Sequence, residues 1–85
     1  MRLAKFVKFR EENFGGVLFE TRSEKVFTLN PTAAAVVREI QSGASEREIA
    51  ERLKARYDDA SGALERELRD LIADLRSKGL VEDSA

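Results

Sequence analysis

Carboxylates are the main side chains in this sequence that could supply acid–base or ligand chemistry, because the chain has no histidine and no cysteine. The usual zinc ligands, the thiolate nucleophile and the commonest general base are therefore missing. Asp58 and Asp59 are adjacent, but aspartates in a turn before a helix typically cap the helix and compensate its dipole. The sequence thus predicts a protein that is not an enzyme, with no catalytic residue, no metal and no cofactor.

The pair Gly15-Gly16 is a second feature that could bind a ligand, since glycine-rich turns can cradle phosphates. A phosphate cradle of this kind needs a helix to begin after the glycines, whereas an apolar run typical of a strand follows this pair. We therefore expect the two glycines to form a bend or a bulge.

The charge balance excludes a general attraction to nucleic acid or anionic lipid. Fifteen basic and 16 acidic residues give a formal net charge of -1. No stretch approaches the roughly 20 apolar residues that a membrane helix needs, and the N-terminus has no run typical of a signal peptide. Without cysteine the chain has no disulfide bonds, which is the usual situation in a reducing compartment. We expect a cytoplasmic protein that binds neither nucleic acid nor membranes.

The first third of the chain carries all five phenylalanines and has the alternation typical of strands. Apolar and β-branched residues gather in three runs, at residues 5–10, 17–21 and 25–29. The connections between these runs are too short for a parallel return, so the runs must pair as an antiparallel meander. In such a meander the run 25–29 lies at an edge of the sheet.

The remaining two thirds show the spacing of amphipathic helices, which we expect at residues 31–42, 45–57 and 61–78. Asn30 is a favoured N-cap and Pro31 suits the first helical position. The second helix opens with a Ser-x-x-Glu capping box, and residues 82–85 should fray. Residues 1–85 thus predict one α+β domain, a winged helix-turn-helix with a three-stranded antiparallel sheet followed by three helices.

A winged helix suggests a DNA-binding regulator, in which the helix at 61–78 would enter the major groove. The exposed charges of this helix alternate in sign, however, so its acids would repel the phosphates that its arginines attract. DNA binding therefore rests on an analogy of fold and not of site. A structural interaction domain of a larger enzyme is a further alternative.

The strand at 25–29 offers another kind of site, because an edge strand presents unpaired amides and carbonyls to other chains. The run contains one lysine, Lys25, and no proline. One interpretation is that its shortness and this lysine protect the edge. The other is β-augmentation, in which an extended peptide adds a strand and its alternate side chains enter pockets.

Residues 27–36 (Phe-Thr-Leu-Asn-Pro-Thr-Ala-Ala-Ala-Val) resemble a segment of the PqqD family, in which a strand ends in Leu-Asn and Thr-Ala opens a helix. The resemblance continues through Gly43 after the first helix, residues 45–50 in the second, and the Lys-Gly-Leu-Val ending at 78–81. It covers residues 16 to 82.

The resemblance implies a precursor-peptide recognition element, the winged-helix peptide chaperone used in making ribosomally synthesised, post-translationally modified peptides (RiPPs). Such a module binds the leader segment of a precursor peptide as an extra strand on its third strand, in the cleft between that strand and the third helix. It then delivers the peptide to a modifying enzyme, here a radical S-adenosylmethionine (SAM) maturase. The partners implied are therefore a leader peptide and that enzyme.

Carried over residue by residue, the resemblance implies backbone pairing by the third strand, cleft contacts by apolar residues of the third helix, and contacts from its arginines to acidic leader residues. The apolar residues could instead be plain core, and the arginines a solvated surface. The peptide-binding residues expected on this basis are Lys25, Val26, Phe27, Thr28, Leu64, Leu68, Arg69, Ile72 and Arg76.

Overall fold

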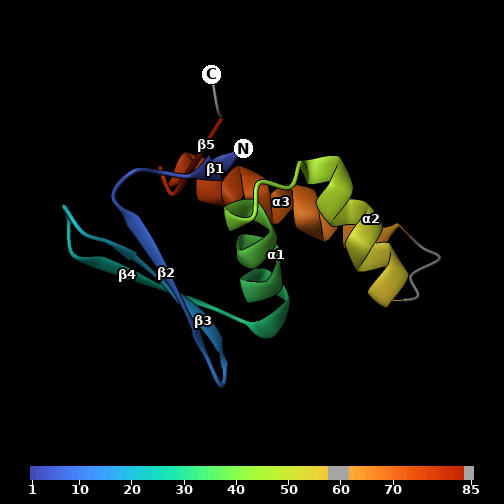
Figure 1. Cartoon of the computed structure of the whole chain (residues 1–85), viewed down its shortest axis with the longest axis horizontal. Coiled ribbons are helices and arrows are strands. Elements are labelled where there is room, and N and C mark those ends of the chain that lie inside the picture. Colours follow the sequence, from blue (N-terminus) through green and yellow to red (C-terminus); the bar gives the residue numbers. More distant parts are fainter. Residues whose placement is uncertain (58–61, 84–85) are drawn as a thin grey trace.

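A computed structural model describes residues 1–57 and 62–83 and shows an open sheet with the helices on one side of it (Figure 1). The predicted α+β class, with the main strands before the helices, is confirmed. The elements in chain order are β1 (Arg2–Leu3), β2 (Val7–Glu12), β3 (Gly15–Glu20), β4 (Lys25–Leu29), α1 (Pro31–Gln41), α2 (Glu46–Arg56), α3 (Ala63–Ser77) and β5 (Val81–Glu82).

Strands β2, β3 and β4 form the predicted antiparallel meander, with β3 in the centre. The bounds of β4 agree with the expected 25–29, but the first two strands differ from 5–10 and 17–21. Their ends differ because Glu12 pairs directly with Gly15 across a two-residue turn. The glycine pair therefore lies inside a continuous ladder and forms no bulge.

The glycine pair is needed because β3 passes very close to its neighbours. Gly15 has φ 141°, and a Cβ atom on it would collide with the backbone carbonyl of Leu29. A Cβ atom on Gly16 would lie 2.7 Å from Cε1 of Phe9. Glycine thus allows β3 to lie against the junction where β4 ends and α1 begins.

The two chain ends meet in a small second sheet that the sequence did not predict. Arg2 pairs with Glu82 in the β1–β5 ladder, and the Arg2 Nε atom lies 3.0 Å from a carboxylate oxygen of Glu82. The expectation that residue 82 frays is therefore wrong, because a partner 80 residues away holds it. Residues 84–85, which belonged to the same expectation, lie outside the described residues.

The helices begin where the capping signals predicted. The side chain of Asn30 accepts a hydrogen bond from the Ala33 amide at 2.8 Å, and Ser45 and Glu48 form both bonds of a capping box. Hydrogen bonds to the Glu48 carboxylate from the Ser45 amide, and secondarily from the Ser45 hydroxyl, lower the pKa of that carboxyl. Helix α3 begins at Ala63, after Gly62 in the left-handed conformation. The aspartates at 58–59 and the expected start at 61 lie outside the described residues.

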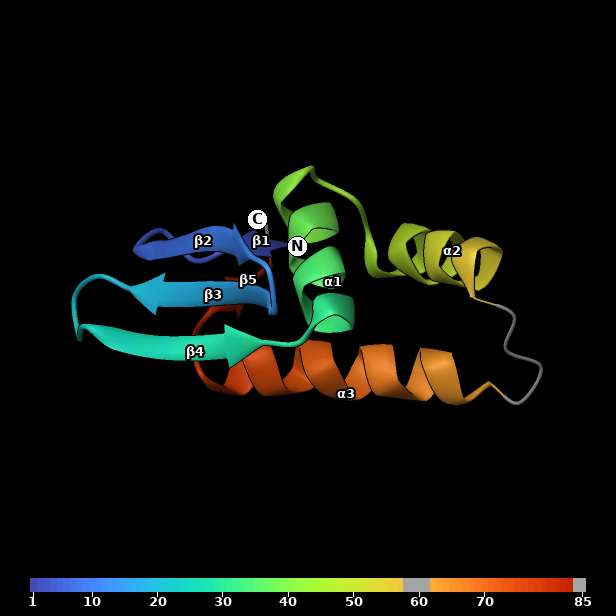
Figure 2. The ribbon, with the colours of Figure 1, turned by 90° about the horizontal axis from the view of Figure 1, so that it is seen from below.

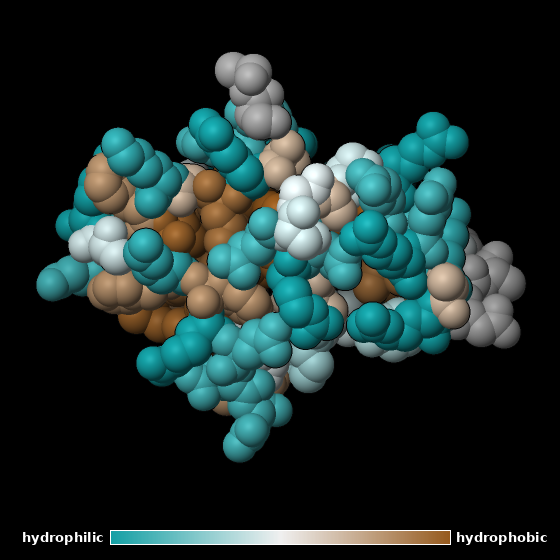
Figure 3. Space-filling view, in the orientation of Figure 1, coloured by the Kyte–Doolittle hydropathy of each residue, from teal (hydrophilic) through white to brown (hydrophobic). Residues whose placement is uncertain are grey.

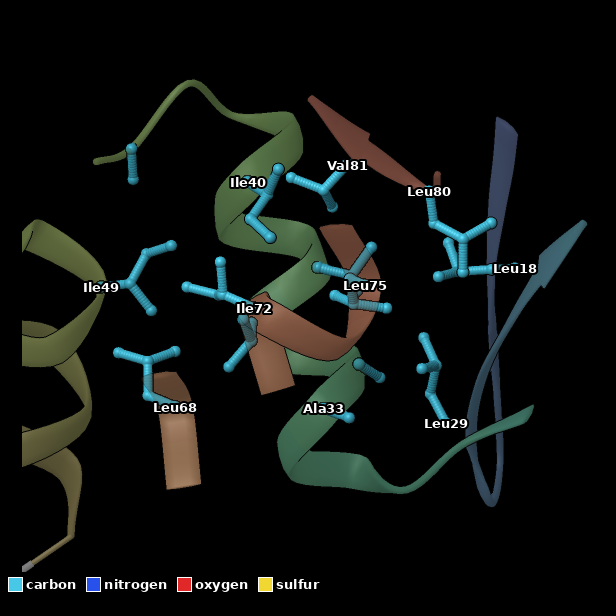
Figure 4. Packing of buried hydrophobic residues seen from close by; sticks show 14 of the residues in the cluster. Leu18, Leu29, Ala33, Ile40, Ile49, Leu68, Ile72, Leu75, Leu80 and Val81 are labelled. Atoms are coloured by element: carbon cyan, nitrogen blue, oxygen red, sulfur yellow. The ribbon is translucent and has the colours of Figure 1, made fainter. Parts of the chain in front are cut away.

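The core lies where α1 packs between the sheet and the other helices (Figure 4). Leu18 of β3, Ile40 of α1 and Ile49 of α2 are fully buried, as is Leu80 after α3. Tyr57, which the helical spacing would place in the buried stripe of α2, is 42% exposed. No helix within residues 1–57 and 62–83 is long and apolar enough to cross a bilayer.

We predict that Gly15→Ala lowers the free energy of unfolding by about 2–4 kcal/mol, because the new methyl group meets the Leu29 carbonyl and the residue must keep a positive φ. Gly43→Ala is the matched control. Gly43 also has a positive φ, 91°, but open space surrounds its Cβ position, so its loss should be about 1 kcal/mol. Urea unfolding measures both, and equal losses would contradict the close approach.

Candidate functional site

The outer edge of β4 is free to pair with another chain. Strand β4 pairs with β3 along one side, and no hydrogen bond among the described residues joins its other side to a second element. In an antiparallel pair, alternate residues direct their N–H and C=O groups away from the partner strand. The edge therefore offers backbone donors and acceptors that no other element in residues 1–57 and 62–83 pairs with.

The opposite edge of the sheet, at β2, is less suited to pairing. Four of its six residues are charged, and Glu11 forms an ion pair at 3.1 Å with Arg38 of α1. The Val7 amide already donates to the Ala4 carbonyl at 3.0 Å. Charged side chains of this kind are a common protection of sheet edges, so β4 is the edge better suited to a guest strand.

A cleft lies between β4 and the C-terminal half of α3, which run side by side in Figure 2. It encloses about 430 Å³. Phe27 and Leu29 line it from the strand, and Leu75 of α3 and Leu80 line it from the helical side. We call this space the strand cleft; its remaining lining residues are Val26, Thr28, Asn30, Ala33, Leu71, Asp74 and Lys78.

A charged pair on α3 forms the rim of the strand cleft. The Lys78 Nζ atom lies 2.7 Å from a carboxylate oxygen of Asp74 and 5.8 Å from the centre of the Phe27 ring. Both charged side chains are about half exposed, so they stay hydrated while the apolar floor lies below them. This rim can pair with a guest side chain of either sign.

The strand cleft continues along α3 into a second hollow of about 400 Å³ between α1, α2 and α3. The two spaces share Asn30, Ala33 and Leu71. Beyond Leu64, a third hollow of about 270 Å³ reaches Tyr57. The three spaces form one continuous trough. We call the second and third hollows, which lie beyond β4, the helical trough. An extended peptide on β4 could continue through it along the first half of α3.

The structure places the sequence-predicted residues in different surroundings. Val26, Phe27 and Thr28 line the strand cleft, whereas Lys25 is exposed at the start of the strand. Leu64 and Leu68 line the helical trough. The other three are not among the lining residues: Ile72 is fully buried in the core, Arg69 is exposed, and Arg76 pairs with Asp83 at 2.8 Å.

Leu71, Asp74 and Lys78 of the strand cleft were not identified from the sequence. Their spacing of three and four residues places them on one helix face, which is a signal that the sequence contains. What it lacks is the information that the second half of α3, rather than the first, lies beside β4. In residues 1–57 and 62–83 no cluster of acidic side chains is placed to hold a metal ion.

The turn that begins β4 is held by the Glu20 carboxylate at the end of β3. This group accepts hydrogen bonds from the Ser23 hydroxyl, the Ser23 amide at 2.8 Å and the Arg22 amide at 3.1 Å. The Ser23 hydroxyl makes the largest contribution, and together these donors lower the pKa of Glu20 from its ordinary 4.5 to about 2. Glu20 thereby holds the turn that leads into the exposed edge.

The chain is similar to one protein family and to two solved structures. The sequence profile of the family described as coenzyme PQQ synthesis protein D (PqqD) matches residues 15–81. The structure titled "TbiB1 in Complex with the TbiA(beta) Leader Peptide" is 25% identical, with a TM-score of 0.89 over 100% of this chain and 99% of that one. "Lasso peptide synthetase B1 complexed with the leader peptide" is 28% identical, with a TM-score of 0.85 over 96% of each chain. No curated protein matches the chain significantly.

We predict that the Ser23 amide resonance titrates with a midpoint near pH 2, following Glu20. Because the folded-state pKa lies below the ordinary value, the stabilising effect of Glu20 is complete above about pH 4.5 and is lost as the pH falls through about 2. Ser23→Ala removes the hydroxyl donor and should move the midpoint upward. A wild-type midpoint near 4.5 would show that the carboxylate does not hold this turn.

Proposed function

We propose that this chain, which belongs to the PqqD family, is a RiPP recognition element that binds the leader segment of a ribosomally synthesised precursor peptide as a fourth strand on β4. The observation that carries the proposal is the vacant edge of β4 beside an apolar cleft. The two similar solved structures are both complexes with leader peptides, which supports the same use of this fold here.

Backbone pairing and side-chain burial contribute differently to the binding. A five-residue guest strand makes a few backbone hydrogen bonds, each worth about 0.5–1.5 kcal/mol net, and ordering the free peptide offsets part of this gain. Apolar burial at roughly 25 cal/mol per Å² must supply the remainder. The affinity should therefore depend on one or two apolar leader side chains that enter the strand cleft beside Phe27.

We expect the guest strand to run antiparallel to β4. Antiparallel pairing is slightly more stable per residue than parallel pairing. An antiparallel guest has its N-terminal flank at the Leu29 end of β4, where the helical trough begins with Asn30 and Ala33. Its C-terminal flank leaves past Lys25. The leader would thus fill the trough, while the attached core peptide extends away from the helices.

The charges on α3 support a peptide partner over DNA. Asp74 pairs with Lys78 at 2.7 Å, and Asp83 pairs with Arg76 at 2.8 Å. Each pair cancels a positive charge that a phosphate backbone would need. These contacts favour a neutral or mixed-charge peptide in the trough over the DNA-binding alternative.

The chemistry in this proposal belongs to a partner enzyme, and the chain itself acts without a cofactor as a cytoplasmic peptide carrier. The family resemblance predicts a radical SAM maturase as the recipient. The likeness to lasso peptide synthetase B1 favours a second class, an enzyme that processes lasso peptide precursors. An assay of precursor modification by an enzyme of each class, with and without this chain, would show which class is the partner.

We predict that Phe27→Asp and Leu71→Asp each weaken leader binding by about 10- to 100-fold, because each places a charge where an apolar leader side chain should be buried. Isothermal titration calorimetry with a synthetic leader peptide from a candidate precursor measures the change. Arg69→Asp, on an exposed part of the same helix, is the control and should bind as the wild type does.

Circular dichroism and thermal unfolding establish that each variant is folded. If both folded cleft variants bind the leader at wild-type strength, the strand cleft is not the binding site. If the wild-type chain binds no leader at all, the proposed function itself is wrong.

A further inference from the structure

The face of the main sheet that points away from α1 carries an ordered set of side chains, most of which lie outside the strand cleft. The strand register places Lys8, Phe19 and Val26 in one row across the three strands. It places Arg10, Val17 and Thr28 in the next row. We call this surface the outer sheet face.

The outer sheet face is apolar at its centre and uncovered. Figure 2 shows the three strands with no helix in front of them. Val26 is 58% exposed, and a shallow hollow of about 580 Å³ runs between it, Phe19 and Val17. On another side of the molecule, Figure 3 shows hydrophilic side chains covering α2 and apolar ones gathered over the sheet half. Apolar surface of this kind typically marks an interaction site.

Two cations of β2, Lys8 and Arg10, lie along one side of this apolar centre. Lys8 makes no ion pair with any residue in 1–57 or 62–83, while Arg10 pairs with Glu12 at 2.6 Å. The face therefore keeps an uncompensated positive charge beside Phe19, its neighbour across the strands. A partner complementary to it presents an apolar side chain with a carboxylate next to it.

We propose that the outer sheet face docks the modifying enzyme, through an apolar protrusion on the enzyme that is flanked by carboxylates. The inference rests on the proposed function, because the face is continuous with the edge that would receive the leader. In an added strand, the residues opposite Val26 and Thr28 would point to this same face. An enzyme docked here contacts the chain and the leader together, and so binds the loaded carrier more tightly than the empty one.

The charge of the face disfavours a second copy of the chain as the occupant. Two copies placed face to face would bring together two surfaces that each carry an uncompensated Lys8. Like charges brought together in this way cost free energy, whereas an acidic partner gains it. The same reasoning predicts that salt weakens the contact.

The test uses the enzyme whose modification of the precursor depends on this chain. Biolayer interferometry measures the affinity of that enzyme for the chain saturated with leader peptide. Lys8→Glu should weaken the enzyme contact about tenfold, because it places a like charge against the enzyme's carboxylates. Its affinity for the leader, measured separately by calorimetry, should stay within about twofold of the wild type. Arg47→Glu, the same reversal on exposed α2, should change neither affinity.

Val17→Thr adds a second readout, since it keeps a β-branched side chain but makes the centre of the face polar. It should also weaken the enzyme contact. Enzyme affinities of Lys8→Glu and Val17→Thr that equal the wild-type value would overturn the proposal, as would equal enzyme binding by loaded and empty chain. Sedimentation that shows a dimer broken by Lys8→Glu would assign the face to a second copy instead. A failure of leader binding appears separately in the calorimetry.

Discussion

The unpaired outer edge of β4 is the constraint on which the account depends. A folded chain normally pairs or blocks its edge strands, and this chain does so at β2, where charged residues and Arg38 of α1 protect the edge. At β4, in contrast, the outer edge of the strand has no partner among the described residues, and a cleft separates the strand from α3. The short ladder stays in position because Glu20 holds the turn before it and Gly15 packs against Leu29 at its end.

Backbone pairing and side-chain contacts at this edge have different roles. Backbone pairing is insensitive to side chains, so it can hold many peptides with modest affinity. In the proposed complex, selection among peptides comes from the apolar floor at Phe27 and from the Asp74–Lys78 pair on the rim. The outer sheet face lies on the other side of the same strands, so in the proposed complex α3 contacts one face of the guest strand and the enzyme contacts the other.

Much of the fold could be predicted from local sequence signals. The errors concern contacts between residues that are far apart in the sequence. Strand β4 was predicted from alternation and from the Asn30-Pro31 punctuation, which physically ends a strand and caps a helix. The β1–β5 pairing was missed because it joins residues at opposite ends of the chain. The glycine pair was misread because its cause, the carbonyl of Leu29, is a tertiary contact. Leu71 was missed for the same kind of reason, since the crossing of α3 and β4 is not a local property.

The most direct test of the account is amide hydrogen exchange of β4 with and without a synthetic leader peptide, followed residue by residue by NMR. A guest strand predicts that the outward-facing amides of β4 become protected on binding, because they exchange a hydrogen bond to water for one to the peptide. The amides of β2 should keep their exchange rates. Saturation with a peptide that binds but leaves the β4 amides unprotected would contradict strand addition at this edge.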